Sequence, residues 1–130
     1  NRQGAILKNS EFSEIELTLI SEDLVTNYNF EGRLLGKAKF VDEKEENLPQ
    51  EVIRIYKNKS GKFISYMEYS DRDEGIWNSK VFVSEELNLV EIREGLTRED
   101  YKFGSLLIKT VPSKILKTAF YRAIEKLDVV

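Results

Sequence analysis

The chain has 130 residues, of which 41% are hydrophobic and 33% are charged, and its formal net charge is −3. These values predict one globular domain spanning residues 1–130, with too few consecutive apolar residues for a membrane span. The chain has no histidine and no cysteine, which excludes Ser–His–Asp hydrolysis, histidine- or cysteine-based metal sites, thiol nucleophiles and disulfides. Catalysis by carboxylates with lysine, tyrosine or magnesium stays open, but no motif assigns it, so we expect no catalytic residues, no cofactor and no metal ligands. The lack of cysteine favours a cytoplasmic location.

The charge is unevenly distributed along the chain. Residues 11–51 contain 11 acids and 4 bases, whereas residues 109–126 contain 5 bases and 1 acid. Two interpretations follow: solvated faces of ordinary elements, which we favour, or a basic face that attracts the acidic half or a partner.

The first expected elements are two extended segments. In residues 13–20 apolar and polar side chains alternate, which predicts a strand with one solvated face. A second extended segment is expected over about residues 29–41, where Gly32 or Gly36 predicts a bulge or a close backbone approach. The charged residues 42–50 predict an exposed loop whose acids are solvated, although they would also suit a divalent cation.

The clearest hairpin signal lies in the middle of the chain. Residues 52–57 and 62–69 are rich in β-branched and aromatic side chains, and the turn 58–61 contains a glycine suited to positive φ. The lysines at this turn form a candidate basic surface, which consists of Lys57, Lys59 and Lys62. Beside aromatic side chains they would suit nucleic acid, but lysines at a turn more often serve solubility. We favour the second interpretation.

An acidic turn follows at residues 70–75, with Trp77 directly after it. Asp71 and Asp73 have the spacing of a calcium loop, but position five of such a loop is a glycine here and position twelve is not glutamate, so the match fails. Turn chemistry explains these residues without a ligand, and a lone tryptophan most often anchors a core.

The next segments give weaker signals. Residues 80–84 predict another strand, and residues 87–92 are ambiguous between strand and helix. Residues 96–101 suggest a short helix with Thr97 as its N-cap. Residues 105–111 are a short apolar run, either a strand or the approach to the last helix.

The tail of the chain predicts an amphipathic helix that begins near Pro112, where a proline costs no hydrogen bond. Apolar side chains recur on one helical face, at Ile115, Leu116, Ala119, Phe120, Ala123, Ile124 and Leu127. Such a face needs a partner surface, and the sheet is the obvious one.

Three stretches carry a resemblance to a known family. Residues 125–129 (Glu-Lys-Leu-Asp-Val) resemble the Glu-x-Leu-Asp-Ile ending that gives the EXLDI family its name, with valine in place of isoleucine. Residues 30–35 agree with a second family segment, and residues 55–63 are similar to its Tyr-Arg-Thr-x-x-Gly-Lys/Arg segment. These three stretches lie between residues 30 and 129 of the chain.

This resemblance implies a small bacterial protein without an assigned activity. Some family members carry an N-terminal segment like a ribbon-helix-helix DNA binder. We expect this chain to begin past any such segment, so the resemblance implies at most the companion domain of a regulator, and nucleic-acid binding is not expected of this fragment.

The ending poses a physical question, because Asp128 falls where the helix dipole disfavours a negative charge. In one interpretation Asp128 accepts a bond from Arg33 or another base and pins the tail to the sheet. In the other, the segment that contains Glu125, Leu127 and Asp128 is offered to a partner as an added strand or helix. We favour pinning.

We therefore predict an α+β domain, with a mainly antiparallel sheet of about five strands and the C-terminal amphipathic helix packed on one face. The favoured function is a non-enzymatic interaction or regulatory domain whose partner is another protein or a second copy of the chain.

Two other functions stay open. One is small-ligand binding in a pocket between sheet and helix, lined by Trp77, Tyr66 and Phe120. The other is a metal-dependent nuclease or hydrolase that uses Asp71, Asp73, Glu68 and a lysine, for which the usual spacing on a strand is missing.

Overall fold

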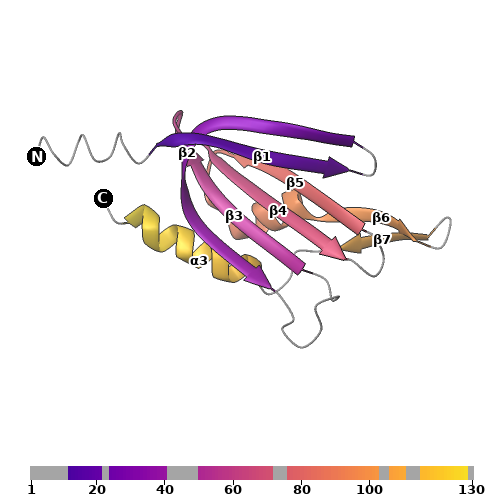
Figure 1. Cartoon of the computed structure of the whole chain (residues 1–130). Coiled ribbons are helices and arrows are strands. Elements are labelled where there is room, and N and C mark those ends of the chain that lie inside the picture. The colour runs from indigo at the N-terminus through magenta and orange to yellow at the C-terminus, as the bar shows by residue number, and fades with distance from the viewer. Residues whose placement is uncertain are drawn as a thin grey trace, which may run out of the picture.

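The computed structural model describes residues 12–21, 24–40, 50–71, 76–102, 106–110 and 115–128, and of residues 21, 71, 76–77, 98–102, 106–110 and 128 it describes the backbone only. Five strands form one antiparallel sheet in chain order, two more strands form a separate sheet, and two helices accompany them (Figure 1). The elements are β1 Ser13–Ser21, β2 Leu24–Phe40, β3 Gln50–Asn58, β4 Phe63–Asp71, β5 Ile76–Ser84, α2 Leu89–Leu96, β6 Arg98–Lys102, β7 Leu106–Thr110 and α3 Ile115–Asp128. The predicted fold class is confirmed.

The sheet is curled because β2 serves two partners in turn. Its first half pairs with β1 up to Gly32, and its second half pairs with β3. The register shifts between Leu34 and Gly36, so the predicted bulge is confirmed at this point. A bulge bends its strand and increases the local twist, and Figure 1 shows β2 turning sharply from the β1 hairpin toward α3.

The curl brings the two outer strands near each other. The Ile20 N–H donates to Ser79 Oγ on β5, and Ser79 Oγ donates to the Thr18 carbonyl, both at 2.7 Å. No backbone ladder joins β1 and β5 in the described sheet, so these side-chain bonds connect its two edges.

One face of the sheet packs on the helices. Gly36 permits the close approach of α3, because a Cβ atom there would meet the Ala119 carbonyl oxygen and lie 2.6 Å from the Ala123 nitrogen. The helix side chains predicted to be buried are confirmed, with Ile124 and Leu127 only partly buried. The buried residues of this helix-side core are Leu35, Ala38, Ile53, Ile55, Phe63, Met67, Ile92, Leu96, Ile115, Leu116, Ala119, Phe120 and Ala123.

The opposite face has a core of its own, covered by the β1–β2 hairpin. Its buried residues are Leu17, Tyr56, Ile64 and Tyr66, and Ile15, Leu19, Tyr28, Phe30 and Val81 pack against them. The Phe30 and Tyr56 rings meet edge to face with centroids 5.4 Å apart. A five-stranded sheet thus divides the protein into two apolar layers.

Around α2 the structure decides two alternatives that the sequence left open and corrects one expectation. The ambiguous segment 87–92 contributes to a helix, whose N-cap is Asn88: its side chain accepts a hydrogen bond from the Glu91 N–H at 3.0 Å. Thr97 is the C-cap of this helix and not an N-cap, because its backbone is extended and leads into β6. The 105–111 segment contains a strand, β7. The beginning expected at Pro112 lies outside the described residues.

Candidate interaction surfaces

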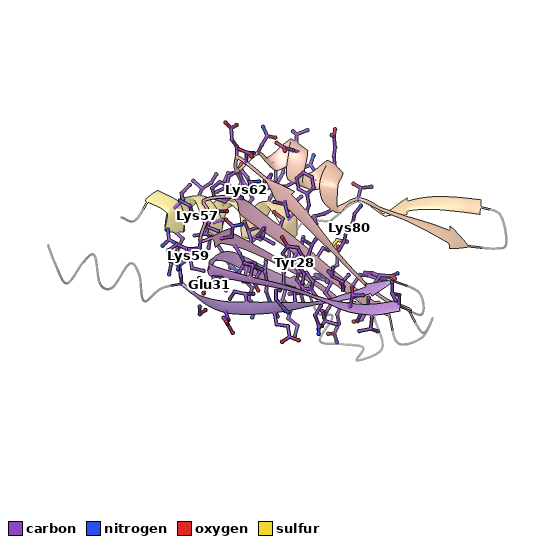
Figure 2. The ribbon with its side chains drawn as sticks, turned by 90° about the horizontal axis from the view of Figure 1, so that it is seen from above. Tyr28, Glu31, Lys57, Lys59, Lys62 and Lys80 are labelled. Atoms are coloured by element: carbon purple, nitrogen blue, oxygen red, sulfur yellow. The ribbon has the colours of Figure 1, made fainter. Side chains whose placement is uncertain are left out.

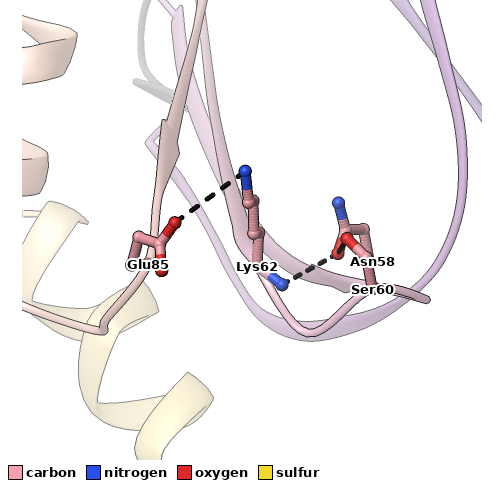
Figure 3. Close-up of polar contacts among 4 residues, drawn as sticks. All are labelled: Asn58, Ser60, Lys62 and Glu85. Carbon is pink, nitrogen blue, oxygen red and sulfur yellow. Dashed lines mark hydrogen bonds and ion pairs between the residues drawn. The ribbon is translucent and has the colours of Figure 1, made fainter.

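The β3–β4 turn is built by one asparagine and one glycine. Gly61 adopts φ +95°, as the turn requires, and its N–H donates to the Asn58 carbonyl at 3.0 Å. The Asn58 side-chain oxygen accepts from the Lys62 N–H at 2.8 Å and from Ser60 Oγ at 2.9 Å (Figure 3). The sequence prediction of a glycine with positive φ is confirmed here.

The candidate basic surface lies at this turn, but acids accompany it. Figure 2 shows Lys57, Lys59 and Lys62 at one end of the molecule together with Glu31. Lys59 pairs with Glu31 at 3.1 Å, and Lys62 pairs with Glu85 at 3.8 Å. These exposed pairs contribute little to stability, yet they lower the positive potential that a polyanion would meet.

Next to this turn lies an acidic depression on the β1–β2 hairpin. It has a volume of about 460 Å³. Its lining residues are Glu14, Ile15, Glu16, Asn29, Phe30 and Glu31. Glu14 stands directly opposite Glu31 in the ladder, an unfavourable like-charge pair. Within the described part of the chain, no group of three or more acids is placed to hold a metal ion.

The three residues proposed for a pocket between sheet and helix are not gathered in one place. Tyr66 belongs to the core on the face away from the helices, whereas Phe120 lies in the helix-side core. The reason is the alternation of side chains along β4, where Phe63 and Met67 face the helices and Tyr66 faces the other way. The Trp77 side chain lies outside the described residues.

Tyr66 instead joins the two edges of the curled sheet. Its hydroxyl lies 3.0 Å from the Thr18 carbonyl and 2.9 Å from Glu68 Oε2, so one proton serves two acceptors. Burial, and then the hydrogen bond to Glu68 and its charge, raise the pKa of Tyr66 above its ordinary value of 10.0. The hydroxyl therefore stays protonated near neutral pH and acts as a structural donor. Glu68, a candidate of the hydrolase hypothesis, is its acceptor.

The residues of the tail hypothesis are only partly described. Arg33 is half-buried on β2, opposite Lys57 in the ladder. Leu127 packs against the helix-side core, and Glu125 is exposed. The Asp128 side chain lies outside the described residues, so pinning of the tail stays a prediction. The side chains of Asp71 and Asp73, which belong to the hydrolase hypothesis, also lie outside the described residues.

The sequence did not reveal the arm formed by β6 and β7. Both views show these two strands projecting from the body, away from the five-stranded sheet (Figures 1 and 2). Its base is held at Thr97, whose carbonyl accepts from Lys80 Nζ at 2.9 Å and whose hydroxyl donates to the Arg93 carbonyl at 2.8 Å. The apolar run in β7 was the available signal for a strand, but the polar residues near it obscured the alternation of apolar side chains.

The tip of the β1–β2 hairpin points in the same direction as the arm (Figures 1 and 2). Two consecutive apolar residues are exposed there, Leu24 by 65% and Val25 by 63%. Exposed apolar side chains at the end of a hairpin are typical of a surface that contacts other proteins.

Comparison with protein-family profiles, with curated proteins and with solved structures finds no match for this chain. The resemblance to the EXLDI family is thereby neither supported nor contradicted. None of the helices in the described residues is long and apolar enough to cross a membrane.

Proposed function

We propose that this chain is a non-enzymatic interaction domain that associates with a second copy of itself through the β6–β7 arm. The projection of this two-stranded arm from the body carries the proposal. A lone two-stranded sheet is at best marginally stable in water, because it has no second surface on which to bury side chains. A partner strand or surface would stabilise the arm.

The sequences of the two strands favour β7 as the edge that pairs. If two β7 strands paired antiparallel about Ile108, Leu107 would stand opposite the partner's Lys109 and no like charges would oppose each other. The same pairing of two β6 strands about Asp100 would set the two Asp100 residues against each other, which is unfavourable. The combined sheet would have four strands in the order β6-β7-β7-β6.

Molecular mass in solution tests this proposal. In sedimentation equilibrium between about 1 and 100 μM, where weak association is measurable, we expect a concentration-dependent rise from monomer to dimer. Ile108→Lys should keep the chain monomeric, because it sets two ammonium groups opposite each other at the centre of the pairing.

A matched control uses an exposed apolar residue elsewhere. Val90 on α2 is 60% exposed, so Val90→Lys also replaces a β-branched apolar side chain by lysine, but on the body, and should leave association unchanged. A monomeric mass at every concentration would overturn the proposal. Equal association of wild type and Ile108→Lys, with matching circular dichroism spectra, would also overturn it.

A further inference from the structure

A second surface, away from the arm, gathers positive charge on the sheet face opposite α3. Lys37 stands directly opposite Arg54 in the β2–β3 ladder, and Lys39 stands opposite Val52. Arg54 pairs in turn with Tyr66, which belongs to the core of this face, so all three cations lie on this side of the sheet. Lys37 and Lys39 are exposed, and Arg54 is half-buried.

This arrangement costs stability in the isolated chain. Like charges directly opposite each other in a ladder repel, and none of these three cations forms an ion pair with a described acid. Among the described residues of β2, β3 and β4, Glu68 is the acid on this face, but it stands opposite Val52 and accepts the Tyr66 hydroxyl. The Arg54 guanidinium lies 6.0 Å from the centre of the Tyr66 ring, which orients it on this face.

A fourth cation lies at the adjoining strand edge. Past Gly32, β2 has no strand neighbour on its β1 side among the described residues. There Arg122 of α3 donates to the Lys37 carbonyl at 2.7 Å, and its side chain is exposed. Lysines at an edge commonly prevent edge-to-edge aggregation. That role accounts for Lys37 and Lys39 but not for Arg54 on the inner strand.

We propose that the edge of β2 over residues 36–40 binds an extended acidic peptide segment, whose carboxylates pair with Lys37, Lys39, Arg54 and Arg122. An added strand would pair along this edge, where Arg122 would exchange the Lys37 carbonyl for a carboxylate of the peptide. The acids of the peptide would also relieve the repulsion between Lys37 and Arg54. A peptide fits better than nucleic acid, because the whole chain is negative at −3 and the patch holds only four cations. This inference goes beyond self-association and does not depend on it.

Fluorescence anisotropy tests this binding, with a short labelled peptide of alternating glutamate and valine as the probe. We expect saturable binding that weakens with salt, and a loss of about tenfold or more in affinity in Lys37→Glu, as for one charge-assisted hydrogen bond. Lys117→Glu makes the same charge change on the exposed face of α3 and should bind within about twofold of wild type.

Thermal melting of the same variants separates binding from folding. Lys37→Glu places a carboxylate opposite Arg54, so its melting temperature should equal or exceed that of wild type while peptide binding falls. Ile108→Lys should bind the peptide as wild type does, which keeps this inference independent of the arm.

Three results would overturn the inference. The first is that the acidic peptide does not bind, and the second is that wild type and Lys37→Glu bind it equally. The third is that a single-stranded oligonucleotide of the same charge binds more tightly than the peptide, which would assign the patch to nucleic acid.

Discussion

Gly36 offers the sharpest test of how the sheet and α3 fit together. A Cβ atom on Gly36 would lie too close to two backbone atoms of the helix, the Ala119 oxygen and, at 2.6 Å, the Ala123 nitrogen. Since carbon and nitrogen need about 3.5 Å, Gly36→Ala would force the helix outward by roughly 1 Å. Backbone atoms cannot rotate away as a flexible side chain would.

The cost follows from what the helix buries. Ile115, Leu116 and Phe120 are all buried against the sheet, and each contributes about 1.5–3 kcal/mol. A gap of up to about 1 Å forfeits a quarter or more of the contact energy, so Gly36→Ala should destabilise the protein by about 2 kcal/mol, in line with overpacked cores. With a urea slope of about 2 kcal/mol per molar, the midpoint falls by about 1 M.

Equilibrium urea unfolding, followed by circular dichroism, measures this change. Gly61→Ala is the control, because a Cβ atom there has no neighbour within 4 Å and only the positive φ is strained. That variant should lose about 1 kcal/mol without moving α3. The Phe120 ring resonances should therefore shift in Gly36→Ala alone. A midpoint within about 0.2 M of wild type would refute the reasoning.

Three further changes have signs fixed by the structure. Ser65 Oγ is fully buried and has no hydrogen-bond partner among the described residues. Ser65→Ala should therefore raise the free energy of unfolding by about 1 kcal/mol, measured in thermal melts. A lower free energy of unfolding would contradict this reasoning. Tyr66→Phe should lose about 1–2 kcal/mol, because the Thr18 carbonyl and the Glu68 carboxylate lose a donor. The raised pKa of Tyr66 adds stability that is present below pH 10.0 and declines as the pH rises above it, so urea melts across that range should show a decline that Tyr66→Phe lacks. Asn88→Ala removes the α2 cap and should lower stability by about 1 kcal/mol, whereas Asn88→Ser should largely preserve it.

Local features of the sequence predicted local structure well. The β3–β4 hairpin follows from two apolar runs around Asn58 and Gly61, and the buried face of α3 follows from helical spacing. Both depend on residues within a few positions of each other. The same local rules assigned Thr97 to the wrong end of a helix, because a threonine suits both an N-cap and an extended residue after a helix. The structure shows that α2 begins at its N-cap Asn88 and that Thr97 is its C-cap.

The candidate site was less accessible to sequence reasoning. Tyr66 and Phe120 are both large and aromatic, and nothing in the sequence says that the sheet separates them. The Lys37–Arg54 pair exists only through the register of β2 against β3, which is shifted by the bulge before Gly36. Similarly, no pattern in residues 98–110 predicts that the β6–β7 arm projects away from the five-stranded sheet.

By itself, the sequence determined the α+β class, the absence of histidine and cysteine chemistry, the central hairpin and the amphipathic helix. Hydrophobic periodicity and turn residues are properties of short stretches of the chain. They can be recognised without knowing which strands pair with each other. Only the tertiary structure decided which side chains share a face, how the β1–β2 hairpin covers the second core and where charges oppose each other. Register and curl arise from packing between residues far apart in the chain, and shifting a strand by one residue exchanges its two faces.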